Sequence, residues 1–509
     1  MKTHGKKRAG GRASKVKLRS SQSEAINPSP PGQISGTYKP LSNEEMTLII
    51  ETAYRLLEEI GIGDVPEKLR KQAVSKGATF KEDRLHFSKN FVKNIIQNAC
   101  KSFTLFGRST EFDITVGGNK SYFGTGGAAV QTKDIETGEY RASTLKDVYD
   151  FSRLSDKLEN VSWFTRCCIA TEIENVFDVE LNTAYAMLKG TNKPIGISFT
   201  QPEFVDPIIE MFDIALGGTG NFAKKPFCKA HISPIISPLR FGEDAFDVSL
   251  ACIKQGMPIN AIIAAQSGAT APATLAGTLA QSTAETLAGL IMINVFEPGY
   301  PVIFSNWPFV IDLRTGAFAG SGGETSAMNA AAAQIGNFLG LPTGVASSMS
   351  DSKTVDAQMG SEKTLSSTAT GLAGANMIYE SAGMMASLLG VSFEAFVADN
   401  EMLATVQRLM RGIEVNSDTL AFDTIKETVF GQGHFLGGNH TISAMQRDYY
   451  YPKLGNRETP TVWKESGGKN MEQQAKEEAK VILKNHKPNY INPKVDSIIR
   501  KKFNILLKN

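Results

Sequence analysis

Between residues 143 and 392 the chain repeats one hydrophobic pattern, in which a short apolar run is followed by a longer segment with helical spacing. Short apolar runs are typical of buried parallel strands, and a helical segment returns the chain to the next strand through a right-handed crossover. Seven runs occur, and an eighth strand is possible near YFGTGG at 122–127. The seven are SWFTRCCIA, PIGISFT, PFCKAHISP, PINAIIAA, PVIFSNWP, PTGVASSM and ANMIYES.

This repeat predicts an α/β fold of the closed (β/α)8 type, a TIM barrel, with an open doubly wound sheet as the alternative. The ends of the apolar runs favour the barrel, because barrel strands deliver functional side chains to a mouth at their carboxyl ends. Small or polar residues of this kind end six of the runs: Thr165, Thr200, His231, Gln266, Asn306 and Ser348.

The segment before the barrel begins with a helix. Ser42 and Glu45 have the spacing of a capping box, and apolar residues follow at helical intervals until Gly61 ends the pattern. Short alternating runs at 102–106, 112–116 and 121–123 then predict strands. We therefore expect a disordered basic tail and linker at 1–40, an α+β lead-in at 41–142, the barrel core at 143–392 and a C-terminal helical extension at 393–509.

Positive charge is concentrated in the first twenty residues, which contain eight bases and no acid. Removing the bases of the first twenty residues leaves 46 of the chain's 54 Lys and Arg residues against 52 acids. Because the basic segment has no apolar region, it is not a secretory signal, and a solvated tail is favoured over a transit peptide. Its eight bases are Lys2, Lys6, Lys7, Arg8, Arg12, Lys15, Lys17 and Arg19.

Composition excludes several classes of protein. No run approaches the roughly 18 apolar residues of a membrane helix, so we expect no membrane association. The five cysteines lack CxxC spacing and His partners, which argues against a disulfide framework and against a metal site. We expect a cytoplasmic protein that binds neither nucleic acid nor, through its own residues, a metal ion.

Common catalytic motifs are absent. The glycine segments GTGGA (124–128) and GSGGETS (320–326) lack the flanking residues of a phosphate-binding loop, which favours tight turns at the barrel rim. The chain has no GxSxG elbow and no Cys–His pattern of a nucleophile. Of the six histidines, His231 ends a strand and is equally compatible with a place in the mouth and with a buried core position.

The predicted mouth is rich in aromatic residues, with acids nearby in the sequence. Aromatic faces and scattered carboxylates bind a quaternary ammonium group through cation–π attraction, whereas plain core packing is the alternative for each ring taken alone. The aromatic candidates are Phe123, Trp163, Trp307, Phe309 and Tyr379, and the acidic candidates are Glu324, Asp351 and Asp356.

Four longer motifs resemble one enzyme family. GATAPATLAGTLAQSTAETLAG (268–289), VASSMSDSKTVDAQMGSEK (345–363), LAGANMIYESAGMM (372–385) and GHFLGGNHT (433–441) are similar to the trimethylamine methyltransferase family of corrinoid-dependent enzymes. The similarity extends from about Leu41 to the C-terminal region. It implies a TIM barrel, in agreement with the repeat.

The resemblance gives Met349 a particular meaning. Family members that demethylate trimethylamine carry pyrrolysine just before the Ser-Asp-Ser-Lys run, and here that position is Met349. The chain therefore resembles the non-pyrrolysine branch, whose characterised members demethylate quaternary amines such as glycine betaine. A methyl group leaves nitrogen by displacement only if the amine departs neutral, so a quaternary nitrogen needs no activation. Met349 then serves as an apolar pocket wall.

The resemblance implies a methyltransferase of class EC 2.1.1 that transfers a methyl group from a glycine-betaine-like amine to Co(I) of a separate corrinoid protein. This chain would bind no cofactor tightly, since cobalamin is supplied by the partner, and a homo-oligomer is implied. A trimethylamine methyltransferase lacking pyrrolysine and a non-catalytic betaine-binding protein stay open. No catalytic residue is assigned, and the expected substrate-binding residues are Phe123, Trp163, His231, Gln266, Trp307, Phe309, Glu324, Met349, Asp351 and Tyr379.

Overall fold

A computed structural model describes residues 27–508 of the chain, so the predicted disordered tail at 1–26 lies outside the described residues. Eight parallel strands, taken in chain order, neighbour one another around the centre of the molecule. They are β6 (Lys120–Phe123), β9 (Phe164–Thr165), β10 (Ile195–Ile197), β11 (Cys228–Ile232), β14 (Ile259–Ile263), β16 (Val302–Asn306), β19 (Thr343–Ala346) and β20 (Met377–Tyr379).

The sheet closes on itself. Where β6 ends and β9 begins, the Ser162 amide donates to the Phe123 carbonyl at 2.7 Å, and the Thr125 amide donates to the Trp163 carbonyl at 3.4 Å. These bonds join the first strand, β6, to the second, β9, and complete the ring of eight. The predicted (β/α)8 barrel is therefore confirmed, and the open doubly wound alternative is wrong.

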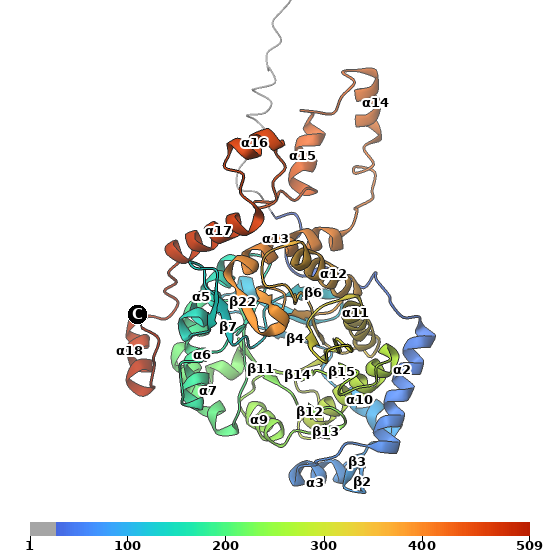
Figure 1. Ribbon diagram of the computed structural model, residues 1–509. Helices are drawn as coiled ribbons and strands as arrows, with labels where there is room; N and C mark the ends of the chain where they lie inside the picture. Colours follow the sequence, from blue (N-terminus) through green and yellow to red (C-terminus); the bar gives the residue numbers. More distant parts are fainter. Residues whose placement is uncertain (1–26, 509) are drawn as a thin grey trace, which may run out of the picture.

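A helix follows each strand and covers the barrel from outside (Figure 1). The eight helices in order are α5 (Leu145–Lys157), α6 (Val176–Gly190), α7 (Val205–Ala215), α9 (Glu243–Lys254), α10 (Leu275–Asn294), α11 (Gly323–Phe338), α12 (Ala357–Ala373) and α13 (Phe393–Arg411). Short pieces η3 (Pro202–Phe204), α8 (Asn221–Lys224) and the hairpin of β12 (Ile235–Ile236) and β13 (Arg240–Phe241) lie between them.

The barrel extends beyond the expected bounds of 143–392 at both ends. Its first strand, β6, lies in the segment expected as a lead-in, near the YFGTGG stretch where an eighth strand was considered possible. Its last helix, α13, lies in the segment expected as an extension. Sequence pattern cannot separate these elements, because a short barrel strand resembles a hairpin strand and a covering helix resembles an appended one.

The lead-in has mixed structure, as expected. Its first helix, α2, has the predicted capping box between Ser42 and Glu45, and Gly61 ends the helical segment with φ 69°. The elements are α2 (Asn43–Arg55), the π-helical turn η1 (Leu56–Ile60), α3 (Glu67–Ser75), α4 (Lys89–Asn98), η2 (Thr110–Phe112) and the hairpins β2 (Thr79–Lys81) with β3 (Arg84–His86) and β4 (Ser102–Leu105) with β5 (Ile114–Gly117).

Residues 27–40 correct the expectation of a disordered linker. Strand β1 (Gln33–Ile34) pairs antiparallel with β6, and Ser29 is fully buried. The Gly36 and Tyr38 amides both donate to the Leu372 carbonyl. Proline and glycine limit regular structure here to the two residues of β1. The backbone amides and carbonyls around it still form hydrogen bonds with the outside of the barrel.

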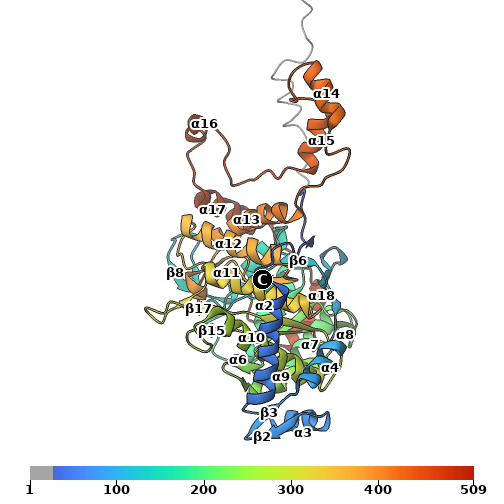
Figure 2. The ribbon, with the colours of Figure 1, turned by 90° about the vertical axis from the view of Figure 1, so that its right-hand side faces the viewer.

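Two small sheets lie at the carboxyl ends of the barrel strands, on the face seen in Figure 1 and at the left of Figure 2. One consists of β15 (Gln266–Ser267), β17 (Phe309–Ile311) and β18 (Phe318–Ala319). The other consists of β7 (Gln131–Lys133), β8 (Tyr140–Ala142), β21 (Met384–Met385) and β22 (Gly390–Ser392), with the turn η4 (Ala386–Leu388) beside it.

The C-terminal segment is helical, as predicted. Helix α17 (Met471–Asn485) packs on α13 and α5, and α18 (Pro493–Lys502) packs on α7. Between them and α13, an arm projects from the barrel and contains α14 (Phe422–Phe430), α15 (Asn439–Arg447) and α16 (Pro460–Glu465), none of which has a buried residue (Figures 1 and 2). Among residues 27–508, no helix is long and apolar enough to cross a membrane.

Candidate functional site

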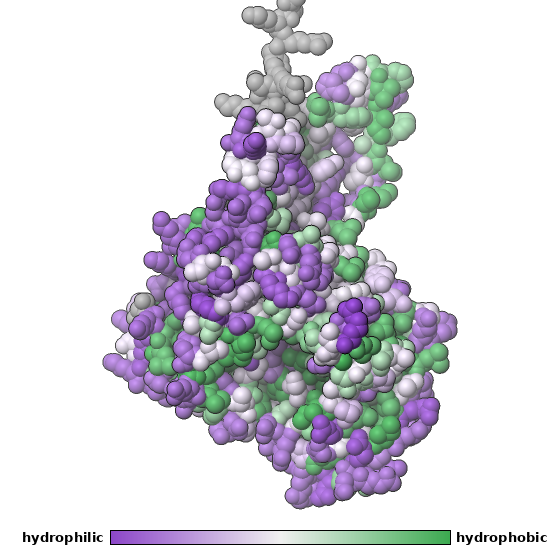
Figure 3. Space-filling view, viewed as in Figure 1, coloured by the Kyte–Doolittle hydropathy of each residue, from purple (hydrophilic) through white to green (hydrophobic). Residues whose placement is uncertain are grey.

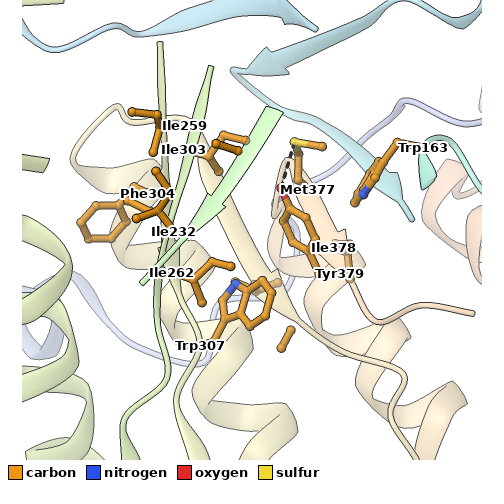
Figure 4. Packing of buried hydrophobic residues seen from close by; sticks show 14 of the residues in the cluster. Trp163, Ile232, Ile259, Ile262, Ile303, Phe304, Trp307, Met377, Ile378 and Tyr379 are labelled. Atoms are coloured by element: carbon orange, nitrogen blue, oxygen red, sulfur yellow. Dashed lines mark hydrogen bonds between the residues drawn. The ribbon is translucent and has the colours of Figure 1, made fainter. Parts of the chain in front are cut away.

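Tyr379 is the centre of an aromatic cluster inside the barrel. Its ring centroid lies 5.1 Å from those of Trp163, Trp307 and His231, at interplanar angles of 63°, 42° and 77°. The four residues lie on or directly beside four different barrel strands, and Figure 4 shows the Trp307 and Tyr379 rings close together with Trp163 at one side. The structure therefore brings together four of the ten predicted site residues, which we call the aromatic cluster.

A lysine lies against this cluster. The Lys229 ammonium, carried by β11, is 5.4 Å from the Trp163 ring centroid and 5.1 Å from that of Tyr379. The ammonium donates a hydrogen bond to Thr165 Oγ1 at 3.0 Å, and the side chain has no solvent exposure. Burial lowers the pKa of Lys229 to about 7. The cluster thus already faces one amine group.

A polar chain continues from Lys229 across the barrel interior. Thr165 Oγ1 lies 3.3 Å from His231 Nε2, and Asn260 Nδ2 lies 3.5 Å from the same nitrogen. Burial, with the nearby Lys229 and Arg166 charges, lowers the pKa of His231 well below its usual value. Because Asn260 Nδ2 can only donate, a neutral His231 accepts at Nε2 and carries its hydrogen on Nδ1.

Glycines make the room that these side chains occupy. A β-carbon built at Gly196 on β10 would lie 2.4 Å from Thr165 Oγ1 and 2.8 Å from Lys229 Nζ. At Gly124, a β-carbon would overlap the Trp163 ring at 2.2 Å. The first glycine of GTGGA is therefore a place where backbone and indole come close together, which adds a packing role to the turn expected there.

The other glycines of GTGGA surround a buried acid. A β-carbon at Gly126 would lie 2.7 Å from Glu380 Oε1, and one at Gly127 would lie 2.8 Å from Oε2. Glu380 directly follows β20, has φ 62°, and is 2% exposed, and its Oε2 has no hydrogen-bond partner among the described residues. Burial raises the pKa of Glu380 to about 8, so its carboxyl is mostly neutral at pH 7.

A buried ion pair fixes the loop that follows Glu380. Lys363 Nζ on α12 is 2.7 Å from Asp399 Oδ2 on α13, and both side chains are 1% exposed. The same oxygen accepts the Gly383 amide at 2.7 Å. The pair therefore connects two barrel helices to the loop between β20 and β21, and thereby holds Glu380 in place.

Arg166 directly follows β9 at the same edge of the barrel. Arg166 is partly solvent-exposed. Among residues 27–508, its guanidinium has no hydrogen bond or ion pair. Burial lowers the pKa of Arg166, while the charges of Glu180 and Glu380 act in the opposite direction. Arg166 also lowers the pKa of His231, so its charge acts within the mouth.

Three other predicted residues lie apart from the cluster or only near it. Phe123 is fully buried and lies beside helix α12, where a β-carbon built at Gly371 would be 3.1 Å from its Cζ. Phe309 is 5.2 Å from Phe318 between ring centroids, within the small sheet over the mouth. Gln266 is paired in register with Phe309 and keeps intermediate exposure.

Met349, Asp351 and Glu324 belong to the rim. Met349 is 1% exposed, and a β-carbon built at Gly320 would lie 3.2 Å from Met349 Cβ. Asp351 Oδ1 accepts the Gly320 amide at 2.8 Å and the Ser387 hydroxyl at 2.7 Å, so it joins two rim loops. Glu324 is exposed in the first turn of α11. Their predicted part in substrate binding stays a prediction.

Sequence reasoning missed Lys229, Glu380 and Arg166. Each was visible as a charged residue inside or directly after an apolar strand run, in PFCKAHISP, ANMIYES and SWFTRCCIA. Charged residues are rarely buried without a partner, and perturbed ones gather at functional sites, so this signal was available. Within residues 27–508, no group of three or more His, Cys, Asp or Glu side chains could hold a metal ion.

The arrangement suits a small organic cation better than a nucleophilic reaction. Three aromatic side chains and a neutral imidazole offer faces to a positive charge, while the five cysteines include four that are fully buried. The space-filling view shows a hollow near the centre of the face that carries the strand ends (Figure 3). A ligand in that hollow would meet groups from several strand ends at once.

Comparisons with known proteins agree on one family. A sequence model described as "Trimethylamine methyltransferase (MTTB)" matches residues 8–504. Glycine betaine methyltransferase from Desulfitobacterium hafniense is 29% identical over 468 residues, covering 92% of this chain and 96% of that protein. A trimethylamine methyltransferase from the same species is 30% identical over 464 residues, covering 90% of this chain and 92% of its own length.

Among solved structures, the monomethylamine methyltransferase of Methanosarcina barkeri aligns over 89% of each chain, with 12% identity and a TM-score of 0.48.

Proposed function

This chain belongs to the trimethylamine methyltransferase family, and we propose that its substrate is a glycine-betaine-like quaternary amine whose methyl group goes to Co(I) of a separate corrinoid protein. The chain is a methyltransferase of class EC 2.1.1. The aromatic cluster around Tyr379 carries the choice of substrate, because its faces can stabilise a permanent positive charge.

The side chain of Met349 favours a quaternary amine over a tertiary amine as the substrate. Its thioether is buried at the rim, and it offers no electrophile to form an adduct with a neutral amine. In the proposed step, an electron pair of Co(I) forms the bond to the methyl carbon, and the C–N bonding pair stays on nitrogen. The amine leaves neutral, so no proton has to be supplied.

The residues of this chain then have three tasks. The aromatic cluster holds the ammonium and fixes the direction of the N–CH3 bond, the apolar wall at Met349 excludes water, and the open barrel mouth leaves one side free for the acceptor. Positioning of this kind lowers the activation barrier of a displacement reaction substantially, because the entropy cost of bringing the two reactants together is met when they bind.

The proposed reaction requires a second protein as methyl acceptor. The corrinoid protein is the methyl acceptor and brings the cobalamin, so this chain needs no tightly bound cofactor of its own. A cytoplasmic location fits that partner. We also propose a homo-oligomer, which the projecting arm with its exposed apolar side chains supports.

The test uses purified protein with a reduced corrinoid protein and follows the absorbance of cobalamin. Glycine betaine or another quaternary amine should produce methylcobalamin only when the enzyme is present. Rapid methylation from trimethylamine with quaternary amines inert would restore the tertiary-amine alternative. Binding of betaine without any methyl transfer would favour the non-catalytic binding protein.

A further inference from the structure

The ionisable side chains near the barrel mouth include two basic groups, a neutral histidine and two acids. Arg166 from β9 and Lys229 from β11 carry or can carry positive charge, and His231 beside them is kept neutral. Glu380 after β20 and Glu180 on α6 are the acids whose charges act on Arg166. Burial raises the pKa of both acids, to about 8 for Glu380, so Glu380 is not a full counter-ion at pH 7.

The geometry leaves Arg166 without a partner. No carboxylate oxygen among the described residues lies within 4.0 Å of its guanidinium, and Glu180 instead accepts the Thr200 amide at 2.7 Å. Glu180 Oε2 and Glu380 Oε2 also have no hydrogen-bond partner in the described chain. A guanidinium that stays partly accessible in a mouth, with five donors and no acceptor, is suited to an anionic group of a ligand.

Arg166 is three residues from Trp163 on the same strand end, a separation of about 10 Å along an extended chain. Trp163 and Thr165 share the inner face of this extended segment, where Thr165 contacts Lys229 and His231, and the charge of Arg166, one residue further on, acts on His231. A ligand with an ammonium group at one end and a carboxylate a few bonds away would meet both features.

We propose, on the basis of the function proposed above, that Arg166 determines specificity by binding the carboxylate of the substrate while the aromatic cluster holds its trimethylammonium group. The substrate is then a zwitterionic betaine. A purely cationic amine such as choline or tetramethylammonium meets an uncompensated guanidinium, which weakens its binding through like-charge repulsion. The carboxylate also fixes the orientation of the amine, since a bidentate pair with Arg is directional.

Titration calorimetry of the full chain tests this assignment without the corrinoid protein. The ligands are glycine betaine, choline and tetramethylammonium. The variants are Arg166→Gln, which removes the charge, Arg166→Lys, which keeps the charge but loses the fork, and the control Arg55→Gln. Arg55 is exposed on α2 and pairs with Glu59, at the outside of the barrel.

We expect Arg166→Gln to weaken betaine binding at least tenfold while choline binds equally well or better, with Arg166→Lys in between and Arg55→Gln unchanged. Betaine affinity that is unaltered in folded Arg166→Gln and Arg166→Lys would overturn the assignment. Equal losses for betaine and choline would also overturn it, because they indicate a structural role.

These outcomes are distinct from a failure of the proposed function. If the wild-type chain binds betaine and methylates cobalamin but Arg166→Gln behaves like wild type, only the assignment of Arg166 is wrong. If the wild-type chain binds no quaternary amine, both proposals are wrong.

Discussion

Trp307 and Phe309 stand close together in the sequence, but only the Trp307 ring contacts Tyr379. If the aromatic cluster binds the ammonium group, Trp307→Leu should weaken glycine betaine binding by about 0.5–2 kcal/mol through loss of a cation–π face. Phe309→Leu is the matched control and should change the affinity little. Titration calorimetry decides between them, and equal losses in the two variants would count against the cluster.

Lys229 gives substrate binding a pH dependence. Below pH 7 its ammonium is protonated beside the Tyr379 and Trp163 rings and repels a second cation. Affinity for betaine should therefore rise as the pH increases through about 7, where Lys229 loses its proton. Ionisation of Glu380 near pH 8 adds attraction in the same direction, while His231 stays neutral throughout this range and the Arg166 charge is constant.

The variant Lys229→Met separates the two groups. It should bind betaine at pH 6 more tightly than the wild type does. Its affinity should then increase with pH only where the Glu380 carboxyl ionises. Calorimetry between pH 6 and pH 9 measures both curves. Identical pH profiles for variant and wild type would show that the Lys229 charge does not reach the substrate.

The residues of the site were partly predictable. Trp163, His231, Trp307 and Tyr379 could be placed near one another because barrel strands direct side chains into a common mouth, and their part in substrate binding stays a prediction. Phe123 could not be placed, since a buried strand is apolar on both faces and its pattern does not tell the inner from the outer side. Lys229 was visible as a charged residue inside an apolar run, and it was passed over because lysine usually lies at the surface.

At the scale of elements, the Lys363–Asp399 pair joins α12, α13 and the loop after Glu380. Replacing either partner alone, as in Lys363→Met or Asp399→Asn, should cost about 3–5 kcal/mol, because one buried polar group is left without its partner. The double variant Lys363→Met with Asp399→Leu should recover part of that loss.

Thermal melts and urea titrations measure these losses. The control is Glu59→Gln, which removes an exposed pair with Arg55 on α2 and should cost less than about 1 kcal/mol. Single variants as stable as this control would show that the buried pair does not hold the two helices together.

The arm of α14–α16 carries many exposed apolar side chains. Phe422, Phe430 and Ile413 are 72%, 85% and 89% exposed, and the arm shows hydrophobic colour along one edge in Figure 3. Surfaces of this kind are usually covered by another chain. If that chain is a second copy, Phe422→Ser with Phe430→Ser should shift the protein toward monomer.

Sedimentation equilibrium measures that shift. Leu48→Ser, which changes an exposed apolar residue on α2, is the control and should leave the assembly unaltered. A wild-type protein that is monomeric, or an oligomer that survives both substitutions in the arm, would contradict a role of the arm in self-association.

The succession of elements was largely predictable, because each apolar run marks a strand and seven of the eight were identified. The bounds of the barrel were not, since β6 is short and α13 looks like any amphipathic helix. Closure depends on hydrogen bonds between the end of β6 and the residues just before β9, which are distant in sequence and carry no local signal.

At the scale of the whole molecule, residues 27–40 attach the N-terminal segment to the outside of the barrel. Removing 1–26 should leave stability and methyl transfer unaltered. Removing 1–38 should lower the melting temperature, because the pairing of β1 with β6 and the bonds of Gly36 and Tyr38 to Leu372 are lost, at about 1 kcal/mol each. Melting curves of the two truncated proteins, which should differ from each other, make the comparison.

The central claim is that the methyl group of a quaternary amine moves from nitrogen to cobalt on this barrel. The most direct measurement incubates the enzyme and reduced corrinoid protein with glycine betaine deuterated in its methyl groups, and analyses both products by mass spectrometry. We predict one deuterated methyl group on cobalamin for each dimethylglycine formed, and no reaction without the enzyme. Unchanged betaine, together with methylcobalamin formed from deuterated trimethylamine, would contradict the account.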